Sequence, residues 1–389
     1  MDLRLGKEYT AFRQQAADFV AQNWSPDDAG DRAKEVAFRR DAARAGLMYL
    51  SFPRAYGGAG TGADPIKDAI VRQEFAKAGA PYLPNGIGHK MLVPTLLVRG
   101  TEAQKEAFVA RALSGEDIWC QGYSEPGAGS DLASLSTRAV RDGDHWIING
   151  SKIWTSNALD ADMMFILVRT DPDAPKHQGI SYLLLDMKAP GITVRPLRQM
   201  TGETGFAEVF FDNVATPLDW IVGEPGEGWA VSRTTLGFER TSIAAPSMMF
   251  DMLRLVRDRA RSTMRNGKPL IDDPAIRDMI AVAEGYATAQ TYSVARLVSM
   301  DRAGLNPGLA ALTNKLHATK TGLKIAEVAE AVLAGEGLIA PEDGMTRHTM
   351  DERFWVLRSL GITIAGGASN IQRNIIAERG LGLPREGAV

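Results

Sequence analysis

Two short segments of the sequence combine residue types that could hold a phosphate-bearing ligand with a flat ring. The first, Ser124-Glu-Pro-Gly-Ala-Gly-Ser-Asp131, places glycines between hydroxyl side chains. Glycine lets the backbone approach a ligand closely, and successive backbone N–H groups in such a loop can surround phosphate oxygens. A tight turn that leads out of a strand has the same composition. The segment alone therefore leaves a phosphate site and a plain turn both open.

The second segment, Lys152-Ile-Trp-Thr-Ser-Asn157, places a large indole beside two hydroxyls. Trp154 can pack against a flat cofactor ring such as a flavin, and Thr155 and Ser156 can donate hydrogen bonds to the polar edge of that ring. The alternative is a core tryptophan followed by solvated hydroxyls. In isolation the pattern fits that alternative as well.

Two further segments lie towards the C-terminus. Glu239 and Arg240 fall at the predicted start of a long helix, where an acidic residue either does chemistry or simply complements the helix dipole. Beyond them, Ala365-Gly-Gly-Ala368 forms a glycine turn that leads into a helix, and Ser369 or Asn370 is the predicted N-cap. Neither segment defines a reaction without further context.

The elements that position these segments change in character along the chain. Apolar residues recur with helical spacing before residue 118, with predicted helices over 65–77 and 101–113. Short apolar runs between turn formers follow, and the predicted strands are 146–148, 163–168, 180–185 and 209–211. Helical spacing then returns at 276–287 and 309–316. We predict helical residues 1–118, a β domain over 119–225 and a helical bundle over 226–389.

Composition excludes several classes of protein. The net charge of -3 argues against a general nucleic-acid binder. The sequence contains no run of about 20 apolar residues, so no membrane span is predicted. The five histidines are scattered without metal-ligand spacing, so no metal site is expected. Cys120 is the only cysteine, which rules out an intrachain disulfide and fits a cytoplasmic protein. No serine or cysteine triad, Rossmann fingerprint or P-loop stands out.

Taken together, these segments resemble the acyl-CoA dehydrogenase family. The loop Phe52-Pro-Arg-Ala-Tyr-Gly-Gly-Ala-Gly60, the segments at 124–131 and 152–157, and the stretch 366–379 match four family motifs in the right order. The resemblance implies a mainly α fold with an N-terminal helical domain, a middle β-barrel-like domain and a C-terminal four-helix bundle. It also implies FAD bound non-covalently at a subunit interface of a homo-oligomer, either a dimer or a tetramer.

The resemblance also implies roles for individual residues. The FAD contacts fall on the two segments and the strand before them: Gln121, Tyr123, Ser124, Gly129, Ser130, Trp154, Thr155 and Ser156. Ser124 is expected at the flavin ring, Ser130 near the pyrophosphate and also at the substrate, and Ser156 near the reactive nitrogen. The implied reaction is α,β-desaturation of an acyl-CoA, with electrons passed to an electron-transfer flavoprotein or a similar acceptor.

The sequence departs from the family pattern at the expected base. Many members carry a glutamate where this chain has Gly366, and glycine cannot take a proton. A minority place the glutamate directly before an arginine at the start of the first bundle helix. Glu239 and Arg240 match that arrangement, so Glu239 is the predicted base and Arg240 a predicted substrate contact.

Two other departures leave alternatives open. The usual Arg-x-x-Phe-Gly motif is replaced by Thr263-Met-Arg-Asn-Gly267, so Arg261 or Arg265 would have to supply its contact with the FAD of a neighbouring subunit. The motif Gly-Gly-Thr-Ser-Glu is Gly366-Gly-Ala-Ser-Asn370 here. Because Gly366 supplies no base, a monooxygenase, a desulfinase-like enzyme and a desaturase of carrier-protein-bound acyl groups also remain alternatives. So does a weakly catalytic chain of a hetero-oligomeric dehydrogenase.

Overall fold

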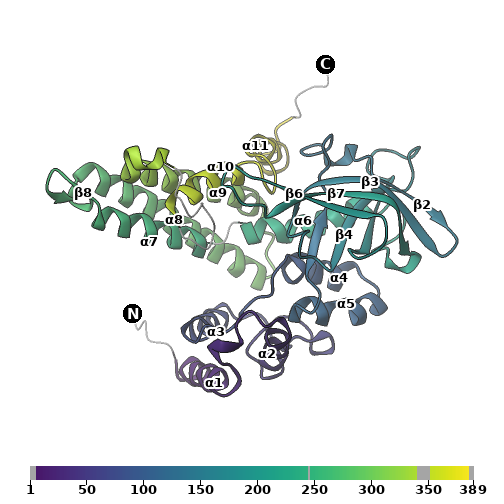
Figure 1. Cartoon of the computed structure of the whole chain (residues 1–389), viewed down its shortest axis with the longest axis horizontal. Helices are drawn as coiled ribbons and strands as arrows, with labels where there is room; N and C mark the ends of the chain where they lie inside the picture. The colour runs from purple at the N-terminus through teal and green to yellow at the C-terminus, as the bar shows by residue number, and fades with distance from the viewer. Residues whose placement is uncertain (1–5, 244–245, 340–350, 385–389) are drawn as a thin grey trace. The chain divides into compact units, whose positions relative to one another are not determined.

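The computed structural model describes residues 6–243, 246–339 and 351–384, without the side chains of 240–243 and 301–302. Its internal contacts divide the chain into two compact units, which are described separately (Figure 1). The first unit contains Met1–Leu197 and Phe206–Thr235, and the second contains Arg198–Gly205 and Leu236–Val389. The division falls inside one helix, α6 (Gly228–Ile243).

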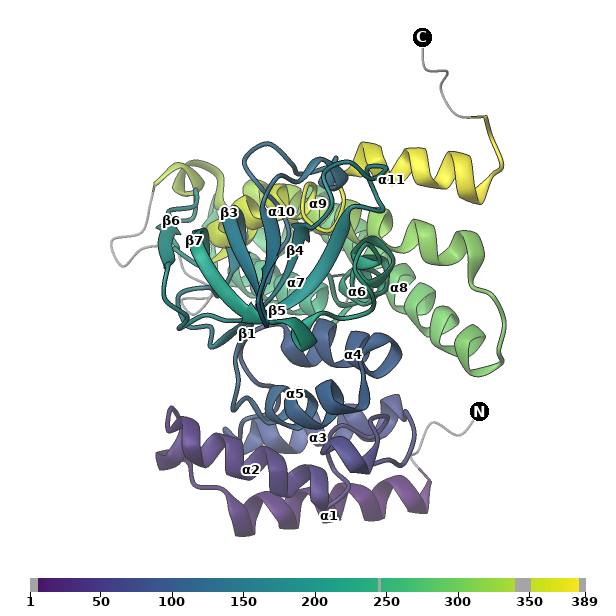
Figure 2. The ribbon, with the colours of Figure 1, turned by 90° about the vertical axis from the view of Figure 1, so that its right-hand side faces the viewer.

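The first unit begins with five α-helices, which Figure 2 draws from purple to blue. They are α1 (Lys7–Asn23), α2 (Arg32–Arg44), α3 (Pro65–Lys77), α4 (Val93–Arg99) and α5 (Glu102–Ser114). The Asp64 side chain caps α3 by accepting from the amides of Ile66 and Lys67, and Thr101 and Gln104 form a capping box on α5. The helices predicted over 65–77 and 101–113 are confirmed to within a residue.

The same unit continues with a seven-stranded sheet of order β1-β4-β2-β3-β7-β6, in which β5 pairs with β4. The strands are β1 (Trp119–Gly122), β2 (Arg138–Asp142), β3 (His145–Ser156), β4 (Met163–Arg169), β5 (Ile180–Asp186), β6 (Ile192–Leu197) and β7 (Phe206–Pro217). Side chains of β4 and β5 are buried on both faces, which explains the unbroken apolar run 163–168 in β4 and the mainly apolar run in β5, where Ser181 is a buried polar exception. The four predicted strands are confirmed, and β3 and β7 extend well beyond the apolar runs that predicted them.

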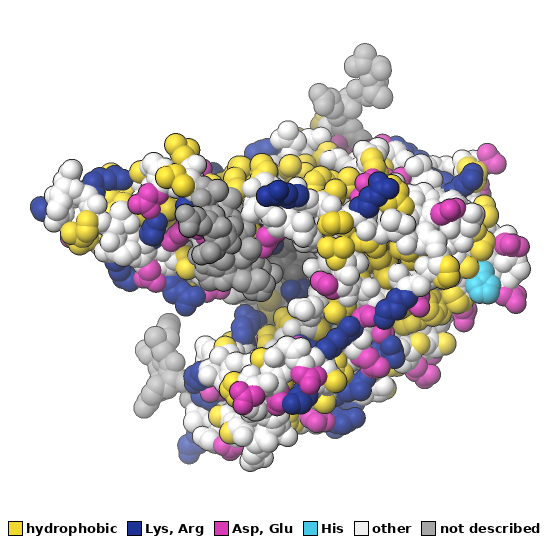
Figure 3. All heavy atoms as spheres, viewed as in Figure 1, with side chains coloured by type: hydrophobic (Ala, Val, Ile, Leu, Met, Phe, Trp, Pro, Cys, Tyr) yellow, Lys and Arg dark blue, Asp and Glu magenta, His cyan; other side chains and the backbone are white. Residues whose placement is uncertain are grey.

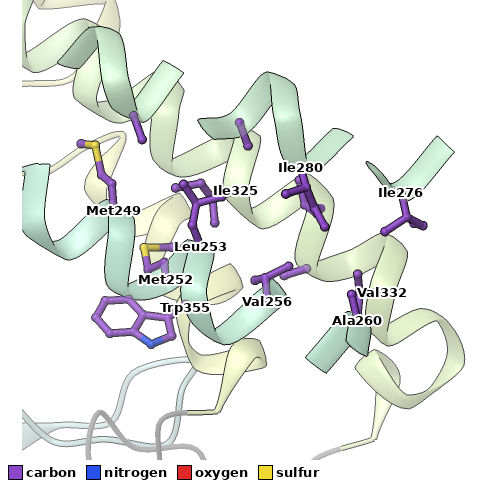
Figure 4. Close-up of a cluster of buried hydrophobic side chains, with 14 of the residues drawn as sticks. Met249, Met252, Leu253, Val256, Ala260, Ile276, Ile280, Ile325, Val332 and Trp355 are labelled. Atoms are coloured by element: carbon purple, nitrogen blue, oxygen red, sulfur yellow. The ribbon is translucent and has the colours of Figure 1, made fainter. Parts of the chain in front are cut away.

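The second unit is a helical bundle with one short hairpin. Its elements after α6 are α7 (Pro246–Ser262), β8 (Met264–Arg265), β9 (Lys268–Pro269), α8 (Pro274–Arg302), α9 (Gly308–Leu333), α10 (Glu352–Ile362) and α11 (Ser369–Ile375). Figure 4 shows part of the core, to which α7 contributes Leu253, α8 contributes Ile280 and α9 contributes Ile325. Burying each such side chain contributes roughly 1.5–3 kcal/mol. The predicted fold class, mainly α with a β domain in the middle, is confirmed.

Two local predictions are wrong. Glu239 does not lie at the start of a helix, because α6 begins earlier, at Gly228, and Glu239 falls in its last turns. Helix α6 can begin there because a Cβ on Gly228 would lie 2.4 Å from the carbonyl carbon of Ser181, so only glycine lets the helix start pack on β5. The second error concerns α11, whose N-cap is Ala368 and whose first residue is Ser369. The Ser369 hydroxyl donates to the Thr363 carbonyl at 3.4 Å instead of capping.

The surface carries both signs of charge. Figure 3 shows basic and acidic side chains interspersed over one face, with hydrophobic side chains between them. Among the helices of the described residues, none is long and apolar enough to cross a membrane.

Candidate active site

Trp154 is presented to solvent by an irregularity in β3. The pairing of β3 with β7 shifts register between Lys152 and Thr155, and Trp154 takes a left-handed backbone conformation with φ of 59°. Such a conformation is strained for a bulky residue, at a cost of about 1–3 kcal/mol, and strain of this kind concentrates at functional sites. The indole is 58% exposed and contacts the Phe206 ring edge-on, with centroids 6.0 Å apart. The bulge therefore aims a large flat ring outward.

The same irregularity joins the two segments that the sequence singled out. The Ile153 amide leaves the β3–β7 ladder and donates to the Ser124 carbonyl at 2.8 Å. The chain after Ser124 turns tightly, since the backbones of Glu125 and Ala128 bond to each other at 2.9 and 3.0 Å. The first segment is thus a tight turn, and a backbone hydrogen bond ties it to the residue directly before Trp154.

A buried ion pair connects the two segments a second time. The Lys152 ammonium is 2.7 Å from the Glu125 carboxylate and also donates to the Tyr123 carbonyl at 3.2 Å. Glu125 further accepts from the amides of Ser136 and Thr137, at 2.7 and 2.9 Å. Lys152 is fully buried and Glu125 is 6% exposed. A pair removed from water in this way tolerates the loss of neither partner.

The two pKa values show how the pair is balanced. Burial by itself raises the pKa of Glu125, but the Lys152 ammonium and the donated hydrogen bonds outweigh it and hold the pKa at about 2. Burial lowers the pKa of Lys152 below its ordinary value, and Glu125 offsets only part of that effect. Both groups are charged near neutral pH.

The predicted cofactor residues divide into accessible and buried ones. Gly129, Ser130 and Trp154 are exposed, and Gln121, Ser124 and Ser156 are half-buried. Tyr123 is 5% exposed and Thr155 is fully buried. The Thr155 hydroxyl has no hydrogen-bond partner among the described residues, which is unusual for a buried hydroxyl. All eight residues belong to the first unit, and the Ile153–Ser124 hydrogen bond joins the two segments that carry most of them.

Glu239, the predicted base, lies in the second unit and is half-buried. A carboxylate near the C-terminal end of a helix is unfavourable to the helix dipole, so the explanation that Glu239 merely complements the dipole no longer applies. Lys315 of α9 interacts electrostatically with it. The side chain of Arg240 lies outside the described residues, so its substrate contact stays a prediction.

The glycine turn near the C-terminus is held by buried side chains of the same unit. Gly366 and Gly367 have φ of 63° and 101°, a region that favours glycine. The Lys315 ammonium donates to the Gly367 carbonyl at 2.8 Å, and Gln372 donates weakly to the Gly366 carbonyl at 3.5 Å. A Cβ on Gly367 would meet the Gln372 amide nitrogen at 2.3 Å. The turn therefore requires glycine for both backbone geometry and space.

The two arginines proposed for an interface contact lie close together in the second unit. Arg261 ends α7 and pairs with Asp258 at 3.1 Å. Arg265 stands on the β8–β9 hairpin, whose turn residues Asn266 and Gly267 both have positive φ. An Asn-Gly pair is typical of such a two-residue hairpin turn, so the sequence contained this signal.

Other candidate chemistry is disfavoured. Cys120 is fully buried in β1, and burial raises the pKa of its thiol, which makes it a poor nucleophile. His89 is also buried, and burial lowers its pKa to about 3. Among the residues that the structure describes, no group of three His, Cys, Asp or Glu side chains is arranged to hold a metal.

Three family models match the chain in succession. The N-terminal domain of acyl-CoA dehydrogenase matches residues 6–116, its middle domain residues 120–214 and its C-terminal domain residues 226–381. These three matches and the fold define the class of the protein, and the chain belongs to the acyl-CoA dehydrogenase family. It is accordingly an oxidoreductase, and members of this family are FAD-dependent.

Individual relatives extend over nearly the whole chain. Acyl-CoA dehydrogenase IpdE1 of Mycobacterium tuberculosis is 38% identical over 357 residues, covering 90% of this chain and 88% of the relative. The solved structure of the Tcur3481-Tcur3483 steroid ACAD has a TM-score of 0.79 at 30% identity, covering 99% of this chain and 100% of that one. The ChsE4-ChsE5 complex from Mycobacterium tuberculosis has a TM-score of 0.78 at 29% identity, with coverage of 99% and 100%.

Sequence reasoning missed two functional candidates. Lys152 lay inside a segment chosen for its aromatic and hydroxyl residues, and nothing local revealed that it pairs with Glu125, 27 residues earlier. Lys315 was not singled out at all. The sequence signal for Lys315 was its helical spacing, because it lies on the same buried face of α9 as Ala318 and Ile325.

Proposed function

We propose that this chain binds FAD and desaturates an acyl-CoA thioester between its α and β carbons, with Glu239 as the base. The observation that carries the proposal is the half-buried Glu239 carboxylate, held in the last turns of α6 while Gly366 offers no side chain at the commoner base position. The base takes the α proton as the β hydrogen leaves with its electron pair. When bound, FAD supplies the acceptor for that hydride.

The first unit fits a flavin. The exposed indole of Trp154 offers an apolar face. Ser124 precedes Trp154 in the sequence and Ser156 follows it; both are half-buried, and their hydroxyls can donate to the polar edge of a ring. The buried Tyr123 and Thr155 would support this platform, contacting the cofactor through their backbones. Trp154 is strained and remains more than half exposed in spite of its edge-on contact with Phe206, which supports a ligand as a further partner.

The turn beyond Ser124 fits the cofactor's pyrophosphate. The amides of Gly127, Gly129 and Ser130 donate no hydrogen bond within the described residues. A Cβ built on Gly127 or Gly129 would meet no atom within 4 Å, so the space beside them is open. Free amides in an open glycine-rich turn are suited to phosphate oxygens. Ser130 would add its hydroxyl there.

A second candidate keeps the same fold but makes the chain one half of a two-chain enzyme. Two of the similar solved structures carry paired names, Tcur3481-Tcur3483 and ChsE4-ChsE5. Those names favour an assembly with an unlike partner chain over the predicted homodimer or homotetramer. The word "steroid" in one of them favours ring-bearing acyl groups as substrates to test.

The test is to purify the chain alone and measure its flavin spectrum, its mass in solution and its reduction of a dye by acyl-CoAs. The panel holds butyryl-CoA, octanoyl-CoA and the CoA thioester of a steroid side-chain acid. We expect a yellow protein that reduces the dye anaerobically with at least one thioester and yields the 2-enoyl-CoA. Product formation that needs oxygen would favour a monooxygenase, and a colourless protein that turns yellow with an unlike partner would favour the two-chain enzyme.

A further inference from the structure

A hollow on the surface of the first unit is lined by two arginines. Arg99 ends α4, and Ala230, Arg233 and Thr234 lie in the first two turns of α6. The hollow has a volume of about 270 Å³, and both arginines are exposed. All four lining residues belong to the first unit. The hollow is distinct from the region of Trp154 and the glycine turn, since no residue of either lines it.

The two helices that line the hollow are joined by a buried contact. The hydroxyls of Thr95 on α4 and Thr235 on α6 are 3.0 Å apart and hydrogen-bonded, and both side chains are fully buried. Arg99 follows Thr95 by about one helical turn, and Thr234 directly precedes Thr235. The Arg99 guanidinium donates to the Thr234 hydroxyl at 3.4 Å. The positions of the lining residues are therefore fixed by the packing of α4 on α6.

No carboxylate that the structure describes balances the positive charge in this hollow. Neither Arg99 nor Arg233 forms an ion pair within the described residues. Elsewhere in the same unit, arginines that lie together share an acid, since Arg40 and Arg111 both pair with Glu116. Two like charges repel each other, and an anion placed between them replaces that repulsion with attraction. The hollow is therefore suited to an anionic ligand.

A terminal phosphate group matches both the charge and the donors of the hollow. It carries a charge of about −1.5 to −2 near neutral pH and three strong acceptor oxygens, so it balances two guanidiniums better than a carboxylate does. Guanidiniums bind phosphate through paired N–H groups, and the Thr234 hydroxyl can supply a further donor. The hollow is much larger than the roughly 30 Å³ that one water occupies in the liquid, so a molecule that carries the phosphate also has room.

We propose that the hollow between α4 and α6 binds a terminal phosphate group through Arg99, Arg233 and Thr234. The site does not depend on the proposed dehydrogenation. The phosphate can come from two sources, either as free inorganic phosphate or as the monoester of a coenzyme such as CoA, which carries one on its ribose. The same experiment separates these two sources.

The test is the binding of inorganic phosphate to the purified chain, followed by phosphorus NMR at constant ionic strength. The double variant Arg99→Gln, Arg233→Gln removes both charges from the hollow. Its matched control is Arg138→Gln, Arg141→Gln, which removes two exposed arginines of β2 that do not line the hollow. Ala230→Asp keeps both arginines and places a carboxylate in the hollow. An acid in the first turn of a helix is favourable, so this variant should fold.

We expect the affinity for phosphate to fall by roughly tenfold or more in Arg99→Gln, Arg233→Gln, because hydrogen bonds to charged groups are strong. Ala230→Asp should lose binding similarly, and the β2 control should bind as the wild type does. Phosphate that binds the wild type and the Arg99→Gln, Arg233→Gln variant equally overturns the site, and so does a wild type that binds none. Neither result bears on dehydrogenation, which the assay does not measure.

Competition then identifies the source of the phosphate. Displacement of phosphate by CoA but not by dephospho-CoA, which lacks the ribose phosphate, supports the coenzyme monoester as the ligand. If neither compound displaces phosphate, the site binds the free ion. Displacement by both compounds to the same extent contradicts a site for a terminal phosphate.

Discussion

Lys152 and Glu125 form a buried ion pair of 2.7 Å that joins the turn after β1 to the bulge in β3. Lys152 lies two residues before the exposed Trp154, and Glu125 begins the turn that contains Gly127 and Gly129. The pair contacts none of the accessible surface itself. We therefore expect the pair to fix the spacing between Trp154 and the glycine turn. In our proposal these two segments bind the flavin ring and the pyrophosphate of FAD.

Removing the Lys152 ammonium alone should destabilise the folded protein. Lys152→Met leaves the Glu125 carboxylate buried without its partner, and such losses typically cost about 3–5 kcal/mol. We expect a free energy of unfolding lower by that amount in urea titrations, with flavin content reduced in parallel. The double variant Lys152→Met, Glu125→Gln removes the buried charge while keeping an acceptor for one of the Ser136 and Thr137 amides, and it should recover part of the loss.

A matched surface lysine provides the control. Lys188 is exposed and pairs with Asp162 at 3.0 Å, so Lys188→Met should cost no more than about 1 kcal/mol. If Lys152→Met is no worse than Lys188→Met, the buried pair does not hold the two segments together.

The pair also predicts a pH dependence of stability. Because the pKa of Glu125 is held at about 2 in the folded protein, its ionised form contributes stability above the unfolded-state pKa, which is about 4.3. That contribution is lost as the pH falls from about 4.3 towards 2. Comparing urea unfolding of wild type with Glu125→Gln, we expect a stability gap near pH 6 that closes towards pH 2. A gap that stays constant over this range would contradict the assignment.

Trp154 should matter for cofactor binding far more than for folding. Trp154→Gly removes the indole and at the same time suits the positive φ of this position, so stability should be unchanged or higher. FAD affinity should fall by roughly 2- to 12-fold, since aromatic contacts are worth roughly 0.5–1.5 kcal/mol. Fluorescence titration of FAD into apoprotein measures this. Val140→Ala, which trims another exposed apolar side chain of the sheet, should leave FAD affinity unchanged.

Much of the architecture follows from patterns in the sequence. The buried strand β4 is an unbroken apolar run and β5 a mainly apolar one, and the helix at 65–77 carries its own cap in Asp64. What the sequence could not provide was long-range placement. The start of α6 depends on the close approach of Gly228 to Ser181, and the bulge at Trp154 depends on register with β7. Contacts such as Lys315 with Gly367, 52 residues apart, leave no local signal.

The central claim is that Glu239 removes the α proton, and Glu239→Gln tests it most directly. Glutamine keeps the size and a hydrogen-bonding capacity of the side chain but cannot act as a base at neutral pH. The measurement is solvent deuterium uptake at the α carbon of the most active thioester, together with the flavin spectrum of the variant. We predict that deuterium uptake falls by roughly 10²–10⁴-fold, the contribution typical of general base catalysis, and that the flavin spectrum stays that of the wild type. Uptake near the wild-type rate in a flavin-loaded Glu239→Gln protein would contradict the claim and place the base elsewhere.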